Sequence, residues 1–153
     1  MKIHVNYLVT MGDSPEITDV SAFVDKESAK ADLASLKKQA KEFNDEAEEE
    51  DSSDWCQARS SSTEKGEGVA KPGDTVFVVI ETNWLEVVET KAKPFYFENF
   101  AKEYIAKRKK KFHGDNPKLV PFDEEENLEE TLHLCDDSLM QDVFFEIQKV
   151  TIR

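Results

Sequence analysis

The sequence predicts an α+β fold: a mainly antiparallel sheet of about five strands, with two or three amphipathic helices packed on it. Two observations support this expectation. Apolar residues alternate with a period of two near both ends of the chain, and between these stretches they recur at helical spacing. A chain of 153 residues is typical of one domain with a buried core. We therefore expect a single domain over 1–153, with two subdomains divided near Lys91 as the alternative.

The first predicted element is a β-hairpin. Apolar residues occupy every second position from Ile3 to Val9, which indicates a half-buried strand. The segment 12–15, with the sequence GDSP, is typical of a turn. Residues 17–24 then indicate the returning strand.

A helix is predicted from Lys26 to Phe43. Asp25 precedes it and is a good N-cap, because its side chain accepts hydrogen bonds from the free N–H groups of the first turn. Five apolar residues recur at intervals of three and four and form one stripe: Ala29, Leu33, Leu36, Ala40 and Phe43. We expect this stripe to lie buried against the hairpin.

The helical pattern stops after Phe43. An acidic run, 45–51, is followed by a segment rich in Ser, Gly and Glu at 60–73, and both compositions are typical of loops. We therefore predict a mobile loop over about 45–73, which Trp55 and Cys56 hold against the body of the protein.

The middle of the chain predicts two strands and a helix. Residues 75–80 are β-branched or aromatic on both faces, which predicts a central strand. A further strand is expected at 85–89. Helical spacing after Pro94 predicts a second helix, which ends in the basic run 107–111.

The last third of the chain predicts a third helix and a closing strand. Leu128, Leu132, Cys135 and Leu139 share a helical stripe, so we expect a helix from about Glu124 to Leu134 or a little further. The strand 143–152 changes the parity of its apolar residues partway along, and a β-bulge near Lys149 would reconcile the two halves.

The charge is large, negative and segregated. The chain carries 33 acidic and 20 basic residues, a net charge of −13, and a basic island lies between two acidic stretches. An acidic surface repels phosphate backbones, so we expect no direct binding to nucleic acid. A protein partner with a basic surface is the expected ligand. The basic island is interpreted as a cap on its helix or a neutraliser of the protein's own acidic segments.

Two acidic stretches are the candidate partner-binding sites. Their residues are Asp45, Glu46, Glu48, Glu49, Glu50, Asp51 and Asp54 in the first, and Asp123, Glu124, Glu125, Glu126, Glu129 and Glu130 in the second. The first lacks the spacing and glycine of an EF-hand loop, so a solvated loop is the alternative interpretation. The second would stabilise the start of the predicted third helix, and that role is compatible with partner binding.

No motif indicates a catalytic or cofactor site. The chain has no G-x-S-x-G elbow, no P-loop and no dinucleotide fingerprint. His133 and Cys135 form one H-x-C pair, whereas zinc takes about four ligands. We expect no cofactor and no structural metal, and we expect Cys56 and Cys135 to remain unpaired, with Cys135 in the core.

Localisation is inferred from two further patterns. No segment approaches ~18 consecutive apolar residues, so no membrane span is expected. The alternation at 1–7 differs from the unbroken apolar core of a signal peptide. We expect a cytoplasmic protein.

These observations favour a non-enzymatic protein that binds a basic partner and regulates or inhibits it. One alternative is a nucleic-acid mimic, whose carboxylates occupy the nucleic-acid-binding site of its target. The other alternative is an enzyme with a dispersed carboxylate site, which ranks last because no nucleophile or cofactor motif accompanies the acidic residues.

Overall fold

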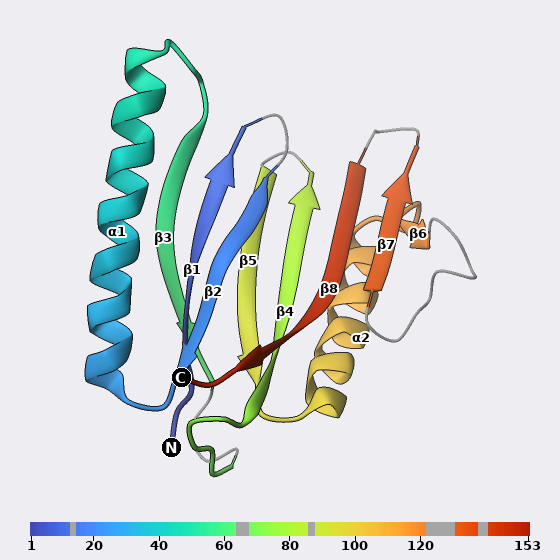
Figure 1. Cartoon of the computed structure of the whole chain (residues 1–153). Helices are drawn as coiled ribbons and strands as arrows, with labels where there is room; N and C mark the ends of the chain where they lie inside the picture. The colour runs from blue at the N-terminus through green and yellow to red at the C-terminus, as the bar shows by residue number, and fades with distance from the viewer. Residues whose placement is uncertain (13–14, 64–67, 86–87, 122–130, 138–140) are drawn as a thin grey trace.

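The computed structural model describes residues 1–12, 15–63, 68–85, 88–121, 131–137 and 141–153, and it confirms the α+β fold (Figure 1). In chain order the elements are β1 (His4–Met11), β2 (Glu16–Phe23), α1 (Lys26–Glu49), β3 (Trp55–Ser62), β4 (Thr75–Trp84), β5 (Val88–Phe95), α2 (Glu98–Asp115), β6 (Val120–Pro121), β7 (Thr131–Asp136) and β8 (Gln141–Thr151).

The first half of the chain forms a three-stranded sheet with the order β2-β1-β3, and all its neighbours are antiparallel. The predicted hairpin is present as β1 and β2. Helix α1 packs on one face, and the Asp25 carboxylate caps it by accepting from the backbone N–H of Ser28. Leu36 and Ala40 of the predicted stripe are buried against Leu8 and Cys56, whereas Phe43 is 37% exposed.

The second half forms a five-stranded antiparallel sheet with the order β5-β4-β8-β7-β6. The predicted central strand is confirmed, because β4 lies between β5 and β8. It continues to Trp84 and β5 begins at Val88, so the further strand expected at 85–89 has different limits. Helix α2 covers one face of this sheet and buries Ala101, Ile105 and Phe112 there.

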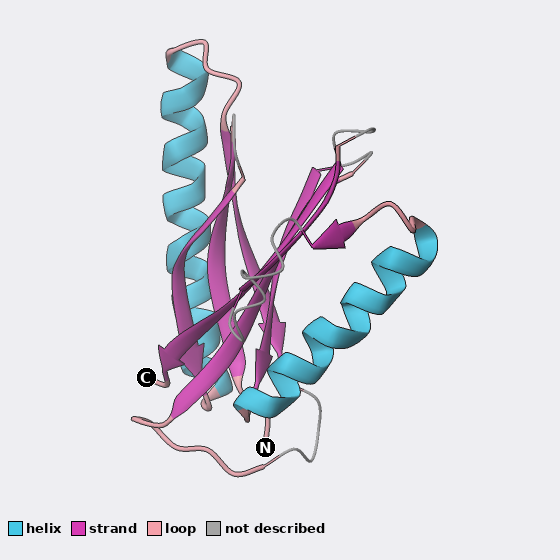
Figure 2. Ribbon diagram, turned by 90° about the vertical axis from the view of Figure 1, so that its right-hand side faces the viewer, coloured by secondary structure: helices cyan, strands magenta, loops and turns pink. Residues whose placement is uncertain are grey.

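The two sheets face each other and give a four-layer arrangement of α1, three-stranded sheet, five-stranded sheet and α2 (Figure 2). The core between the sheets contains Val5 and Val9 of β1 with Val76 and Val78 of β4. A second core lies between the five-stranded sheet and α2. Strand β4 is therefore buried on both faces, which explains its unbroken apolar run.

The change of parity in β8 has a cause other than the expected bulge. The register between β8 and β4 is continuous from Thr75↔Thr151 to Trp84↔Asp142, so the prediction of a bulge near Lys149 is wrong. Phe145 belongs to the core under α2, whereas Val150 belongs to the core between the sheets. The strand thus buries opposite faces at its two ends, and a regular strand satisfies both patterns.

The predicted third helix is wrong over the residues that the structure describes. Residues 131–136 form β7, which pairs antiparallel with β8 from Thr131↔Glu146 to Asp136↔Gln141. The hydrogen bonds between β7 and β8 satisfy backbone groups of β8 that would otherwise lie at an open edge of the sheet. These non-local hydrogen bonds stabilise the strand more than the weak local pattern stabilises a helix. The rest of the expected helix, 122–130, lies outside the described residues.

The segment 45–73, predicted as a loop, contains regular structure in its first half. Helix α1 continues to Glu49, because Ala47 extends its buried stripe beyond Ala40. Residues 55–62 form β3, which pairs with β1 along its whole length. Cys56 is buried beneath α1, as expected, while Trp55 is 42% exposed.

Candidate interaction surface and buried ion cluster

The first acidic stretch forms the C-terminal end of α1 and the turn that follows it. We call this surface the acidic tip, and all seven of its carboxylate residues are exposed: Asp45, Glu46, Glu48, Glu49, Glu50, Asp51 and Asp54. The sequence predicted these residues as a site, but it placed them in a loop. The helix instead fixes the relative positions of the first four.

The charges of the acidic tip oppose the helix on which they lie. The C-terminal end of a helix carries a partial negative charge, which favours cations and disfavours carboxylates. The last turn of α1 contains no basic residue. Among the residues that the structure describes, the tip has one ion pair, between Lys41 Nζ and Asp45 Oδ2 at 2.9 Å.

The turn after α1 contains a second feature that lowers the stability of the folded protein. The N–H of Ser52 donates to the carbonyl of Ala47 and the N–H of Asp51 to that of Glu48, at 2.8 and 3.2 Å, which is the Schellman pattern of helix ends. Asp51 stands at the left-handed position of this motif, with φ +54°. Glycine is the usual residue there, because a side chain costs roughly 1 kcal/mol in this conformation.

Two aromatic side chains border the acidic tip and remain partly exposed. They are Phe43 of α1 and Trp55 of β3. Asn44, the residue after Phe43, links α1 to β3 through two hydrogen bonds to the backbone of Cys56, the residue after Trp55. Its Oδ1 accepts from the N–H of Cys56 at 2.7 Å, and its Nδ2 donates to the Cys56 carbonyl at 2.9 Å. The carboxylates of the acidic tip and the two neighbouring rings therefore form one exposed surface, and Asn44 holds its helix against its strand.

The second predicted acidic stretch lies outside the described residues. Its members are Asp123, Glu124, Glu125, Glu126, Glu129 and Glu130. Their part in partner binding remains an expectation from the sequence.

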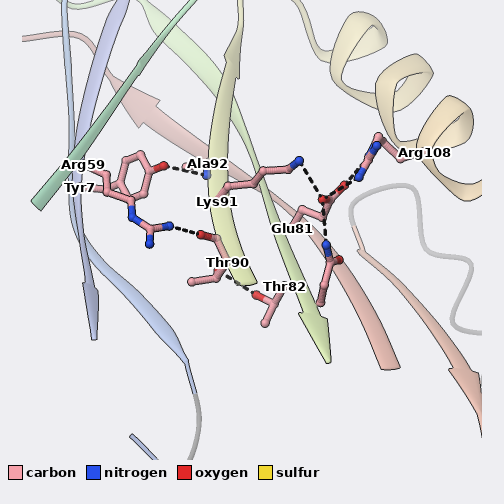
Figure 3. A network of polar contacts seen from close by, with 9 residues as sticks. Tyr7, Arg59, Glu81, Thr82, Thr90, Lys91, Ala92 and Arg108 are labelled. Carbon is pink, nitrogen blue, oxygen red and sulfur yellow. Dashed lines mark hydrogen bonds and ion pairs between the residues drawn. The ribbon is translucent and has the colours of Figure 1, made fainter. Parts of the chain in front are cut away.

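A buried carboxylate beneath α2 forms an ion cluster that the sequence did not predict (Figure 3). Glu81 of β4 is 1% exposed. Its Oε1 lies 2.7 Å from Arg108 Nε and its Oε2 lies 3.1 Å from Arg108 Nη2. Lys91 Nζ lies 3.3 Å from Oε2, and Asn83 Nδ2 donates to the same oxygen at 3.3 Å.

The surroundings of Glu81 keep it ionised. Burial by itself raises the pKa of the carboxyl, but the hydrogen bond from Arg108 and the charges of Lys91 and Arg108 outweigh it, so the pKa lies below its ordinary value. Arg108 comes from the basic island 107–111, and this residue does neutralise one of the protein's own carboxylates. Burial and then the Glu81 charge raise the pKa of nearby Tyr104.

Polar side chains of the three-stranded sheet also reach the outer edge of β5 (Figure 3). The Tyr7 hydroxyl accepts from the N–H of Ala92 at 3.3 Å, and Arg59 Nη1 donates to the carbonyl of Thr90 at 2.9 Å. These contacts fix one sheet against the other and occupy backbone groups that an edge strand would otherwise expose.

The remaining chemically active side chains form no catalytic constellation among the described residues. His133 Nε2 lies 2.8 Å from Asp142 Oδ1, and the ring stacks on Phe144 with centroids 4.0 Å apart. Cys56 and Cys135 are free, buried thiols. Within the described ranges, no group of three or more His, Cys, Asp or Glu side chains is arranged to hold a metal ion.

Comparisons with protein-family models, with curated proteins and with solved structures found no match to this chain. Over its described residues, neither helix has the length and apolar character needed to cross a membrane.

Proposed function

We propose that this protein is a non-enzymatic binding protein that recognises a basic surface on a partner protein through its acidic tip. The proposal rests on one observation: residues of the acidic tip lower the stability of the folded protein. Carboxylates at a helix C-terminus and Asp51 in the left-handed conformation both oppose folding. Residues that lower stability without a structural role are typical of functional surfaces.

The exposed rings of Phe43 and Trp55 add apolar contacts to the charges of the acidic tip. An exposed ion pair contributes only ~0–1 kcal/mol, so carboxylates mainly accelerate association and select the partner. Aromatic residues are enriched among the side chains that hold an interface together. Phe43 and Trp55 beside the tip therefore favour a defined protein interface over diffuse attraction.

The experiment is affinity capture from the native cell at increasing salt, with three baits. The first is the wild-type chain. The second neutralises the acidic tip through E46Q, E49Q, E50Q and D51N. The third neutralises four exposed carboxylates elsewhere through E16Q, E27Q, E103Q and E146Q. The two variants carry the same net charge, so they separate a local surface from overall acidity.

We expect a basic partner that the wild type and the third bait retain at low salt and the second bait loses. Its capture should weaken between ~0.1 M and ~1 M salt, as the Debye length falls from ~10 Å to ~3 Å. Equal capture by the second and third baits, or capture that does not respond to salt, would contradict the proposal. Added nucleic acid that displaces the partner would assign the mimicry form of this function.

A further inference from the structure

A hollow of about 530 Å³ lies where α2 ends beside the ends of β4 and β5. Three apolar residues, Leu85, Phe112 and Leu119, line it together with five polar or acidic residues: Asn83, Glu89, Asp115, Asn116 and Gln141. It is distinct from the acidic tip, which is formed by the C-terminal end of α1 and the turn that follows it. None of the described residues that line it is basic.

The wall contains a buried hydrogen-bond acceptor without a partner. Asn83 is 7% exposed, and its Oδ1 has no hydrogen-bond partner in the described structure. The orientation of this amide is fixed chemically. Glu81 is an ionised carboxylate that only accepts, so the NH₂ group of Asn83 must face it and the carbonyl oxygen must point away.

An unsatisfied buried acceptor lowers the stability of the folded state, and a bound donor would remove that cost. The two carboxylates of the hollow, Glu89 and Asp115, are exposed, so they favour a donor that carries positive charge. The apolar lining residues Leu85, Phe112 and Leu119 fit a short hydrocarbon stem. Arg108 does not fill this role, because it is bound to Glu81 through two hydrogen bonds.

We propose that this hollow binds a primary ammonium or guanidinium group on a short apolar stem. The N–H donors bind Asn83 Oδ1, the positive charge faces Glu89 and Asp115, and the stem contacts Phe112 and its apolar neighbours. The group belongs either to a free amine or to a Lys or Arg side chain of a partner.

The test is a titration of the ¹⁵N-labelled protein, followed by NMR, with three probes that share a butyl stem. n-Butylammonium has charge and donors, butyltrimethylammonium has charge without donors, and n-butanol has no charge. We expect saturable shifts of the Asn83 side-chain amide and of the Phe112 and Leu119 backbone amides with n-butylammonium alone. Equal shifts with all three probes would overturn the proposal, because they would indicate non-specific apolar contact.

Two sets of variants locate the binding site. E89Q with D115N should weaken n-butylammonium binding about tenfold, as expected for the loss of ~1.4 kcal/mol from two exposed charge contacts. The control E16Q with E27Q, which removes the same charge at exposed positions on β2 and α1 outside the hollow, should leave the affinity unchanged. Unchanged affinity in E89Q/D115N would refute the site.

N83A should abolish the saturable shifts, and thermal denaturation shows whether that variant is folded. If it does not fold, the variants at Glu89 and Asp115 still decide the question, because both side chains are exposed. A crystal structure grown with n-butylammonium that shows only water on Asn83 Oδ1 would also overturn the proposal. To separate the two sources, N-acetyl-lysine methylamide is compared with n-butylammonium: tenfold tighter binding assigns the site to a partner's side chain, and equal binding assigns it to a free amine.

Discussion

Replacement of Arg108 by methionine tests the buried ion cluster most directly. The change removes both guanidinium contacts to Glu81 and leaves Lys91 Nζ and Asn83 Nδ2, each at 3.3 Å. Loss of one partner of a buried pair costs about 3–5 kcal/mol. We expect ~3 kcal/mol, the low end of that range, because two partners remain and methionine still packs on Phe112.

The pH dependence of this cost gives a sharper test. Burial raises the pKa of Glu81, whereas Arg108 and Lys91 lower it. In R108M only Lys91 of these two cations remains, so the folded-state pKa of Glu81 is higher than in wild type. If it rises above the unfolded value, the folded state binds the extra proton first and gains stability as the pH falls through that range. In wild type the folded-state pKa is depressed, so the stability from Glu81 is fully present above the unfolded value of about 4.3 and is lost only at lower pH.

Urea denaturation between about pH 8 and about pH 5.5 measures the difference and stays above the sequence pI of about 4.7. We expect the cost of R108M to shrink as the pH falls across this window, while the control K107M, an exposed lysine on the same helix, costs little at either pH. The double variant E81Q/R108M should cost ~1–3 kcal/mol less than the two single changes added together. A small cost for R108M, or a cost independent of pH, would refute the reasoning.

Three further predictions concern stability and reactivity. L36D should unfold the protein or destabilise it by more than ~4 kcal/mol, because Leu36 of α1 is 4% exposed and packs on Leu8 and Cys56, whereas F43D should melt close to wild type; equal melting of the two would contradict the packing of the helix. D51G should raise the free energy of unfolding by ~1 kcal/mol, because glycine adopts the left-handed turn without a side-chain clash, and a loss of stability in urea denaturation would argue against the strain assigned to this turn. Cys135 should react slowly with a thiol reagent in the folded protein, because burial and then the charge of Asp137 raise the pKa of its thiol; labelling as fast as in urea would show that the thiol is accessible.

The parts of the fold that the sequence predicted are those whose pattern reflects local burial. The β1–β2 hairpin, α1 and β4 have periodic apolar residues, and each lies where that period places it. β3 was missed because an edge strand rich in serine resembles a loop until β1 pairs with it. β7 was missed because its assignment depends on β8, which a local window does not include.

The candidate site, like the fold, has features that the sequence predicts and features that depend on tertiary structure. The acidic residues of the tip are evident from composition, but their conflict with the helix end depends on where α1 stops. The meeting of Glu81 and Arg108 depends on how α2 crosses β4, which no spacing in the sequence encodes. One signal was available: Glu81 follows an unbroken apolar run in a central strand, and a charge in such a position requires a partner.

The strand order of the five-stranded sheet also has a consequence for biosynthesis. β8 lies between β4 and β7, yet it follows both of them in the chain. Until β8 has been synthesised, β4 exposes one unpaired edge and a β-branched apolar surface, the features that promote association between incomplete chains. Such chains already carry an excess of acidic residues from the first half of the sequence, and the resulting mutual repulsion opposes their aggregation while the sheet is incomplete.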